Sequence, residues 1–381
     1  MEAIYLDHAA TTPMHPKVIE AMTTVMQDTF GNPSSIHGFG RQARKLLDQA
    51  RRVAAQSINA NEKAITFTSG GTEADNLALL GVAYANQDKG KHIITTKMEH
   101  HATLHTAEHL EKQGFSVTYL DVDDAGHIQL DQFDEALTDQ TILVSVMMVN
   151  NETGVIQPVE EIGERLANHQ AYFHSDAVQG FGMIPIDVEQ MQIDLLTVSS
   201  HKINGPKGIG FLYAGTEVIL DPRQHGGEQE RKRRPGTENV AGIVGFQQAI
   251  ELVNEHRYEN YETYANYRKQ FLNTLEDEGV DFTVNGDLQK TVPTIVNISF
   301  PGANVEAMLT NFDLSGVAAS SGSACTAGSV EPSHVLCAMF GEDHPSTTNS
   351  IRFSFGLANT DENVTKAAQK VAAIIHRLTS M

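Results

Sequence analysis

Residues 64–86 read AITFTSGGTEADNLALLGVAYAN, and this stretch decides the fold class. Its first part, Ala64–Thr68, is a short apolar run that is typical of a buried strand. Its last part, Glu73–Asn86, repeats apolar residues with the period of a helix, and only the small-residue turn Ser69–Thr72 separates the two. A strand that passes directly into a helix is the repeating unit of α/β proteins.

The same alternation of strand and helix continues to about Tyr213. Runs with helical period lie between most of the strands, among them Ala102–Gln113 and Val159–Asn168. Strands that alternate with helices pair in parallel and are covered by helices on both faces. We therefore predict an α/β fold with a mainly parallel seven-stranded sheet. The predicted strands are Ala64–Thr68, His92–Thr96, Val117–Leu120, Ile142–Val149, Ala171–His174, Leu195–Val198 and Ile209–Tyr213.

The chain on either side of this block predicts further helices and a second domain. Apolar residues from Ala43 to Ala54 recur at helical spacing. We expect a large domain over residues 14–257 and a smaller α+β domain that combines residues 1–13 with residues 258–381. The elements predicted after Tyr213 are helices Val240–Val253 and Tyr258–Leu275, strand Thr294–Phe300, helix Val305–Phe312, strand Ile351–Phe355 and helix Asp361–Leu378.

The composition limits the classes of partner. The chain has 381 residues, with 48 acidic against 27 basic side chains and a formal net charge of −21. Such a charge repels phosphates, so we predict no direct nucleic-acid partner and no anionic membrane partner. No apolar run approaches the roughly 18 residues that a membrane helix requires. The basic run Arg231–Arg234 reads equally as a solvated loop or as a functional patch.

Cysteine content and the start of the chain indicate the compartment. Only two cysteines occur, Cys325 and Cys337, which are too few for a disulfide framework. The segment Met1–Ala10 carries two acidic residues and lacks the apolar core of a signal peptide. We therefore expect a reducing compartment, with the cytoplasm as the default.

A turn of small and polar residues follows the first predicted strand, at the edge where open α/β sheets bind ligands. Ser69-Gly70-Gly71-Thr72-Glu73 lets backbone N–H groups approach an anion at the start of a helix. The turn lacks the Gly-Lys-Ser/Thr of a Walker loop, which favours a phosphate outside a nucleoside triphosphate. An ordinary turn and helix cap explains the same residues, and both interpretations stay open.

A lysine directly follows another strand. Ser199-Ser200-His201-Lys202 comes after Leu195–Val198 and before a glycine-rich turn. Most lysines are solvated surface groups, but a lysine near a low-dielectric site loses its proton more readily, as Schiff-base chemistry requires. Ser199 and His201 are placed to hold a phosphate beside it.

A carboxylate, an imidazole and an amide follow three more strands. Asp176, with Gln179 three residues on, suits either a pyridinium nitrogen or the cap of a helix. His100 suits stacking on a flat ring, and Asn151 follows a further strand. A core histidine or a polar turn explains any one of them alone. Together with Lys202 and the phosphate turn they match the needs of pyridoxal phosphate, which we predict as the cofactor; we predict no metal site.

The two cysteines lie in opposite surroundings. Cys325 is in Ser320–Gly328, a run of Ser, Gly and Ala that suits a mobile loop able to carry a thiol. Cys337 is in the apolar helical run His334–Met339, where we expect it to be a small buried hydrophobe. We therefore predict Cys325 as the nucleophile.

Two motifs carry a family resemblance. Ser199–Lys202 with Gly205–Gly208, and Ser320–Cys325 with Glu331–Ser333, resemble the cysteine desulfurases of the iron–sulfur and tRNA-thiolation pathways. Those enzymes are pyridoxal-phosphate enzymes of fold type I and of the class V aminotransferase type. The resemblance extends over nearly the whole chain, from Tyr5–Thr12 to Ile351–Ser354.

The resemblance implies a role for each candidate residue. Lys202 would carry the cofactor as a Schiff base, while Asp176 and Gln179 would contact its ring nitrogen and ring oxygen. His100 would stack on the ring and relay protons, with His101 the lesser candidate. The residues that would hold the phosphate are Gly71, Thr72, Ser199 and His201. Thr237 would reach the same phosphate from the neighbouring subunit of a homodimer. Asn151 and Arg352 would face the substrate, and the guanidinium fork of Arg352 suits its carboxylate.

The resemblance also implies the reaction. L-Cysteine would become L-alanine while its sulfur moves to Cys325 as a persulfide, for transfer to an acceptor protein. Some members of this family dock the iron–sulfur scaffold protein through a long C-terminal tail, and here little sequence follows Leu378. Scaffold docking is therefore in doubt, and we expect a tRNA-thiolating enzyme as the acceptor about equally. The alternatives are a selenocysteine lyase and a catalytically weak platform that binds sulfur carriers.

Overall fold

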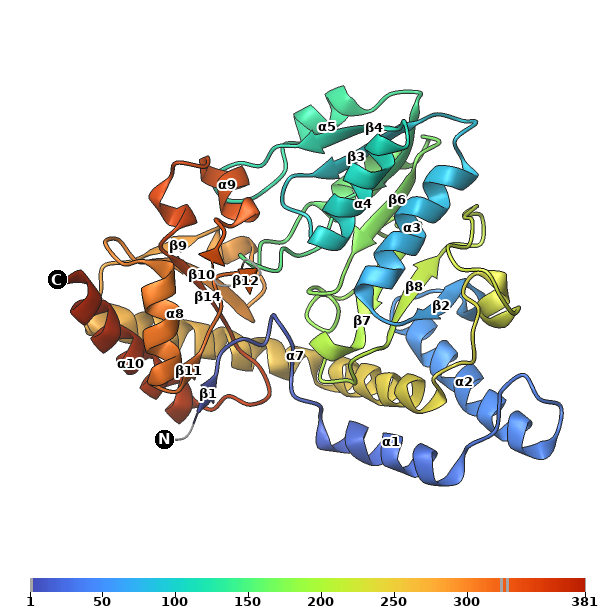
Figure 1. Ribbon diagram of the computed structural model, residues 1–381, viewed down its shortest axis with the longest axis horizontal. Helices are drawn as coiled ribbons and strands as arrows, with labels where there is room; N and C mark the ends of the chain where they lie inside the picture. The colour runs from blue at the N-terminus through green and yellow to red at the C-terminus, as the bar shows by residue number, and fades with distance from the viewer. Residues whose placement is uncertain (1–2, 323–324, 327–328, 381) are drawn as a thin grey trace.

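The structure, a computed structural model, describes residues 3–322, 325–326 and 329–380, and it describes no side chain between residues 323 and 330. The chain forms a large lobe and a smaller lobe, and helix α7, Val240–Asp277, runs along both (Figure 1). The elements nearest the two ends of the chain, β1 and α10, both lie in the smaller lobe (Figure 1). No helix in the described part of the chain is long and apolar enough to cross a bilayer.

The large lobe is built on a seven-stranded sheet, which confirms the fold class that the sequence predicts. The strand order is β2-β8-β7-β6-β5-β3-β4, and β8 runs antiparallel to both of its neighbours. The other strands point the same way, so their carboxyl ends meet at one edge. Their bounds are β2 Ile65–Thr68, β3 His92–Thr96, β4 Ser116–Leu120, β5 Thr141–Ser145, β6 Tyr172–Asp176, β7 Leu195–Ser199 and β8 Gly210–Ala214.

Alternate residues of each strand pack on opposite faces of this sheet. Leu195 and Leu212 belong to the core cluster that contains residues of α3 and α4. Their neighbours Leu196 and Phe211 belong to the cluster with α2, α6 and α7. Because helices cover both faces, β5, β7 and β8 are buried along their whole length. The helices are α2 Gly38–Gln56, α3 Gly71–Ala85, α4 His101–Lys112 and α6 Val159–Leu166.

The smaller lobe has a core of its own. Its antiparallel sheet has the order β14-β10-β9, and its core joins Ile4 and Leu6 from the start of the chain to Phe271 and Phe353. Its elements are β1 Ile4–Tyr5, β9 Thr283–Asn285, β10 Ile295–Ser299, α8 Val305–Leu314, β11 Val317–Ala318, β14 Ser350–Ser354 and α10 Asp361–Thr379. The remaining helices and strands are α1 Pro16–Asp28, α5 Leu130–Ala136, β12 Cys325–Thr326, β13 Ser329–Val330 and α9 His334–Phe340.

Two details of the predicted elements are wrong. The two helices predicted over residues 240–253 and 258–275 are one helix of 38 residues, because neither Gly nor Pro interrupts Asn254–Arg257. The strand predicted over Ile142–Val149 is shorter in the structure and ends at Ser145. Its last residue paired with β3 is Val144, so no sheet partner on that side extends it further. The expected domain boundary at residues 257 and 258 falls inside α7 and stays a prediction.

Candidate active site

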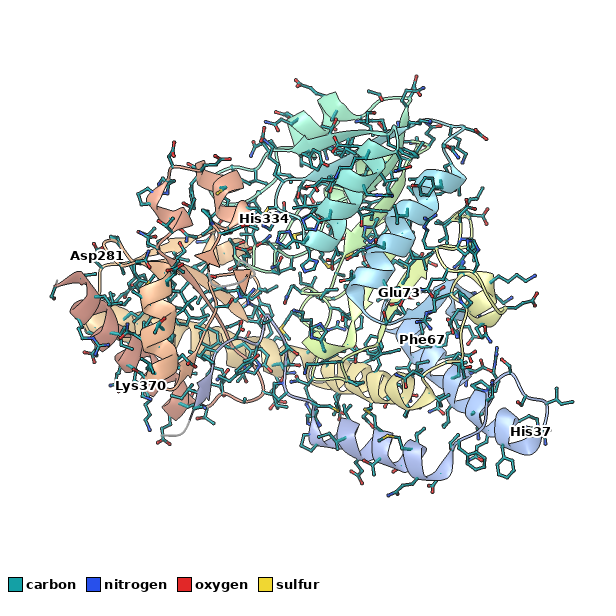
Figure 2. All side chains as sticks on the ribbon, viewed as in Figure 1. His37, Phe67, Glu73, Asp281, His334 and Lys370 are labelled. Atoms are coloured by element: carbon teal, nitrogen blue, oxygen red, sulfur yellow. The ribbon has the colours of Figure 1, made fainter. Side chains whose placement is uncertain are left out.

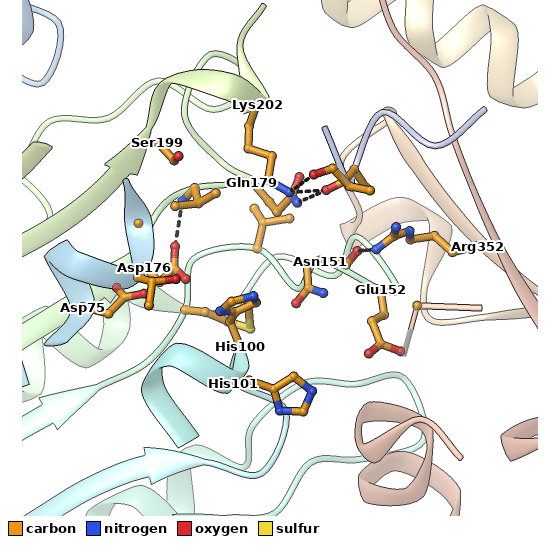
Figure 3. A pocket seen from close by; sticks show the side chains of 18 of the residues that line it. Asp75, His100, His101, Asn151, Glu152, Asp176, Gln179, Ser199, Lys202 and Arg352 are labelled. Atoms are coloured by element: carbon orange, nitrogen blue, oxygen red, sulfur yellow. Dashed lines mark hydrogen bonds between the residues drawn. The ribbon is translucent and has the colours of Figure 1, made fainter. Parts of the chain in front are cut away.

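Residues that follow separate strands of the sheet converge on one cavity of about 410 Å³, which residues of the C-terminal third also line. Figure 3 shows Lys202, Asp176, His100 and Asn151 around this cavity, with Arg352 on its far side. Because the parallel strands end at one edge, residues far apart in the sequence meet here. The candidate residues that line the cavity are Gly71, Thr72, His100, Asn151, Asp176, Gln179, Ser199, His201, Lys202 and Arg352.

The turn between β2 and α3 leaves backbone N–H groups open to an anion. Gly70 is the N-cap of α3, and no side chain caps the helix there. A Cβ on Gly71 would lie 3.1 Å from Val178 Cγ2, so a larger residue would press on its neighbour. Ser199, at the end of β7, lies with its hydroxyl oxygen 3.9 Å from a Cβ built on Gly70. An uncapped helix N-terminus beside a serine hydroxyl is suited to a phosphate.

Lys202 closes the short 3₁₀ turn Ser200–Lys202 that follows β7. Its Nζ donates to the carbonyl of Ala10 at 2.9 Å and also to that of Ala9 (Figure 3). Burial and the positive charge of Arg352 lower the pKa of Lys202 to about 8, against the opposing charges of Asp176 and Asp7. The amine therefore loses its proton more easily than a surface lysine, as a nucleophile toward a carbonyl must.

Asp176 is the last residue of β6 and is buried. Its Oδ1 accepts a hydrogen bond from the Val178 N–H at 2.9 Å, so it caps a turn and not a helix. Burial raises the pKa of Asp176 to about 6, while that hydrogen bond and the charge of Lys202 act against the rise. The positive charge of a protonated pyridine nitrogen would favour the ionised form of such a buried carboxyl group. Gln179 Nε2 donates to the Ala9 carbonyl at 2.9 Å.

His100 is the N-cap of α4, and its Nδ1 accepts the Ala102 N–H at 3.1 Å. The ring is open to the cavity. Burial by the surrounding walls, together with the charge of Lys202, lowers the pKa of His100 to about 4. The ring is thus neutral at physiological pH. Because Nδ1 accepts, the proton is on Nε2, which is free to exchange it with a substrate. His101 also lines the cavity.

Arg352 and Asn151 meet on the side of the cavity toward the smaller lobe. Arg352 Nη1 donates to the Asn151 carbonyl at 2.9 Å, and Nη2 pairs with Asp7 at 2.7 Å. Among the described residues, Arg352 Nε and Asn151 Oδ1 are buried without a hydrogen-bond partner. Both residues therefore keep unused hydrogen-bonding capacity. The guanidinium fork, which the family resemblance assigns to a substrate carboxylate, here donates one N–H group to Asp7 and one to the Asn151 carbonyl.

The two cysteines differ in what the structure describes. The backbone of Cys325 in β12 pairs with Val330 in β13, and its side chain lies outside the described residues. Cys337 is half-buried and not fully buried as predicted, because α9 turns only Val335, Leu336 and Met339 to the core. Burial raises the pKa of the Cys337 thiol, and Glu342 and Glu152 raise it further. A thiol that stays protonated is a poor nucleophile.

Thr237 is the candidate residue that the structure separates from this cavity. It is exposed and lines a different hollow, together with Ser69 and Gly208. The basic run beside it is more than a solvated loop, because Arg234 pairs with Glu73 of α3 at 2.8 Å. This ion pair connects the segment that carries Thr237 to the start of the helix at the proposed phosphate site.

Three acidic residues at the site are missed by sequence reasoning: two line the cavity, and a third pairs with Arg352. Asp75 lies four residues after Gly71 on α3 and is buried. Among the described residues, its Oδ1 accepts no hydrogen bond, and His174 Nε2 lies 3.6 Å from it. A spacing of four residues places Asp75 on the same face of α3 as Gly71, so the sequence could have indicated that Asp75 faces the site. Asp7 pairs with a residue 345 positions away, which no local pattern reveals. Glu152 directly follows Asn151 and is buried.

These groups fit pyridoxal phosphate by their chemistry. The cavity has about 410 Å³, within the range of roughly 300–1,000 Å³ that is usual for small-molecule sites. An uncapped helix start is suited to the phosphate, and an amine with a lowered pKa is suited to the carbonyl. A buried carboxyl is suited to the ring nitrogen, and an imidazole is exposed toward the space between them.

Comparison with known proteins agrees with this chemistry. Residues 4–366 match the family model of the class-V aminotransferases. A Bacillus subtilis (strain 168) protein named "Putative cysteine desulfurase IscS 1" is 60% identical over 379 residues and covers 100% of both chains. "Cysteine desulfurase IscS" of Clostridium botulinum (strain Hall) is 46% identical over 380 residues, covering 99% of this chain and 96% of the relative. The solved structure of a NifS-like protein matches with a TM-score of 0.92 at 34% identity, over 98% of this chain and 100% of that one.

These matches extend over nearly the full length of the chain, and the fold of the solved structure agrees with the mainly parallel sheet. The chain therefore belongs to the class-V aminotransferase family of pyridoxal-phosphate enzymes with fold type I, and within that family to the cysteine desulfurases.

Proposed function

We propose that this chain moves the sulfur of L-cysteine onto Cys325 as a persulfide and leaves L-alanine. The observation that carries this proposal is the meeting of Lys202, Asp176 and His100 in one cavity that Gly322 also lines. Gly322 stands three residues before Cys325, so the segment with the thiol begins at the cavity.

Each wall of the cavity has a part in holding the cofactor. Bound there, pyridoxal phosphate supplies an electron sink that makes the α-proton of the substrate acidic. The carboxylate of Asp176 would keep the ring nitrogen protonated, and the Lys202 amine would form the covalent link. The phosphate would be held by Gly71, Thr72, Ser199 and His201, and Gln179 would reach the ring oxygen.

The residues of this chain would divide the proton and sulfur steps. Arg352 and Asn151 would bind the substrate carboxylate, and Lys202 would take the α-proton. The Cys325 thiolate would then attack the substrate sulfur: an S–S bond forms, and the C–S bond breaks with its electron pair going to carbon. The β-carbon then takes a proton, the α-carbon regains the proton that Lys202 removed, and the product is released as alanine. His100, whose Nδ1 accepts the Ala102 N–H and whose proton is therefore on Nε2, would serve the proton steps around the sulfur.

Reduction with borohydride tests the cofactor half of this proposal. Treatment of the yellow holoenzyme should fix the cofactor covalently, and peptide mapping should find it on Lys202. Lys202→Ala should lose the covalent adduct and the turnover of L-cysteine to alanine. An adduct that maps to another lysine would overturn the assignment of the site.

The homodimer belongs to this proposal and is supported by two observations. Thr237, which the family resemblance assigns to the phosphate of a neighbouring subunit, is exposed and lies outside the cavity of its own chain. A separate apolar patch, made of Phe30, Ile36 and Phe39, is exposed near the start of α2, with Ile36 92% and Phe30 79% exposed. Figure 2 shows His37, which belongs to the same stretch, at the end of the large lobe remote from His334. Exposed apolar patches of this kind mark interaction sites.

The acceptor and the compartment complete the proposal. A thiol that has to act as a nucleophile must stay reduced, which suits the cytoplasm. We propose that the persulfide sulfur passes to an acceptor protein of iron–sulfur cluster assembly or tRNA thiolation. Pull-down from cell extract with the persulfide-loaded enzyme, compared with Cys325→Ala as bait, should recover the acceptor on the loaded enzyme. Recovery of neither class of acceptor would contradict this part of the proposal.

A further inference from the structure

Glu152 is a buried acidic residue of the cavity to which the proposed mechanism gives no role. Its backbone is held on both sides: its N–H donates to Asn150 Oδ1 at 2.9 Å, and its carbonyl accepts from Asn297 Nδ2 at 3.3 Å. Figure 3 shows its side chain pointing away from Asn151 toward the C-terminal part of the chain. The carboxylate is thus presented from a fixed point of the large lobe.

The carboxylate contacts the segment that follows Cys325. Ser333 Oγ donates to Glu152 Oε2 at 2.5 Å, and both side chains are buried. The same Ser333 hydroxyl accepts the Leu336 N–H at 3.1 Å and so caps helix α9. Glu152 therefore fixes the point at which the chain leaves the cysteine segment and enters α9.

The same carboxylate also contacts the segment that precedes Cys325. A Cβ built on Gly322 would lie 2.5 Å from Glu152 Oε2 and 3.0 Å from its Cγ. The backbone of Gly322 is thus packed directly against this side chain, and its φ of +87° is a conformation that glycine adopts without strain. The Gly322 N–H donates to Ser320 Oγ at 3.2 Å, and this hydrogen bond stabilises the backbone turn between Ser320 and Gly322.

We infer that Glu152 is a positioning residue that fixes both ends of the segment carrying Cys325, through Gly322 and Ser333, and so sets the distance from which the thiolate attacks the substrate sulfur. The inference rests on the proposed function, in which Cys325 takes the sulfur. Glu152 contacts the described residues on both sides of the cysteine segment, Gly322 by close packing and Ser333 by a hydrogen bond. Glu152 directly follows Asn151 in the sequence, so the same backbone segment carries a residue proposed to bind the substrate and the residue proposed to position the thiol.

Steady-state kinetics of the holoenzyme test the inference. Glu152→Ala should lower kcat for alanine formation about 10²-fold, the scale expected when a reacting group is displaced by about 1 Å. The spectral change of the bound cofactor on addition of L-cysteine should be retained, because Lys202, Asp176 and His100 are untouched. Glu152→Gln should restore most of kcat, because its amide oxygen still accepts the Ser333 hydroxyl. A role in stability alone would not produce this combination of a retained spectral change, a lowered kcat and rescue by Gln.

Ser333→Ala supplies a second variant in case Glu152→Ala folds poorly. It should also lower kcat, and the double variant should be no slower than the worse single variant, because both remove one contact. Asn304→Ala, which removes the N-cap of α8 away from the cavity, is the matched control and should lower Tm without lowering kcat.

Two results would overturn the positioning role while leaving the proposed function intact. One is a wild-type kcat in Glu152→Ala and Ser333→Ala while Cys325→Ala is inactive. The other is a Glu152→Gln variant as slow as Glu152→Ala. Normal turnover by Cys325→Ala would instead contradict the proposed function itself, whatever the Glu152 variants do.

Discussion

At the scale of single residues, the site depends on which charged groups lose contact with water. Burial makes the charged forms of Lys202 and Asp176 costly, so the pKa of the lysine falls to about 8 and the pKa of the carboxyl rises to about 6. Their attraction for each other limits both shifts. The result is an amine that gives up its proton and a carboxylate that favours a cationic partner, as the proposed cofactor requires.

The lowered pKa of Lys202 predicts how cofactor attachment depends on pH. Only the neutral amine attacks a carbonyl. A pKa of about 8 leaves about one amine in ten neutral at pH 7, against about one in three thousand at the ordinary pKa of a lysine. The rate at which the apoenzyme gains its cofactor absorption band should rise with pH and level off above pH 8. A rate that still rises tenfold per pH unit between pH 9 and pH 10 would contradict the burial of this amine.

The sequence identifies residues that follow strands and misses residues that depend on distant contacts. Lys202, Asp176, His100 and Asn151 could be predicted together because parallel strands end at one edge of a sheet. The pairing of Arg352 with Asp7 joins the two ends of the chain, and no periodicity or spacing encodes it. Except for Asp7, these residues line one cavity.

At the scale of elements, one buried ion pair holds the strained segment that leads to Thr237. Glu230 has a φ of +47°, and its carboxylate makes a two-pronged contact with Arg51 at 2.6 and 2.7 Å. The Phe67 N–H of β2 donates to the same carboxylate at 2.9 Å. Positive φ in a non-glycine residue is unfavourable, so the fixed contacts of this carboxylate hold the segment in a conformation that it would otherwise leave.

Removal of one partner of this pair should destabilise the protein strongly. Glu230→Ala leaves the Arg51 guanidinium buried without its counter-charge, which is expected to lower the free energy of unfolding by about 3–5 kcal/mol. Arg44→Ala removes an exposed ion pair with Asp48 and should cost less than about 1 kcal/mol. Chemical denaturation of the two variants beside the wild type measures both values. Equal small losses would show that the buried pair does not hold the segment.

The elements themselves show where local patterns stop being sufficient. The alternation of strands and helices predicts the sheet, because each buried strand is recognisable locally as a short apolar run. The sequence between Val253 and Tyr258 is polar, so periodicity reads it as a break, yet it contains no residue that ends a helix. The antiparallel direction of β8 is also invisible locally, since a strand buried on both faces reads the same in either direction.

At the scale of the whole molecule, the dimer proposal depends on the exposed patch of Phe30, Ile36 and Phe39. A double variant, Phe30→Asp with Phe39→Asp, should be a monomer by light scattering. If Thr237 of a second subunit holds the phosphate, as we propose, this monomer should also bind the cofactor more weakly. Tyr258→Asp places the same charge at another exposed aromatic residue, on α7, and should leave the mass unchanged. A double variant that remains a dimer would remove the patch from the interface, and a fully active monomer would contradict the role of Thr237.

The measurement that tests the central claim most directly is alanine formation from L-cysteine by Cys325→Ala and Cys337→Ala, followed together with the cofactor spectrum. Cys325→Ala should keep the cofactor and its spectral response to L-cysteine but form neither alanine nor persulfide, because no thiolate remains to take the sulfur. Cys337→Ala should turn over normally, at some cost in stability, since a half-buried thiol is lost from α9. Near-normal alanine and persulfide formation by Cys325→Ala would contradict the account, as would an inactive but folded Cys337→Ala.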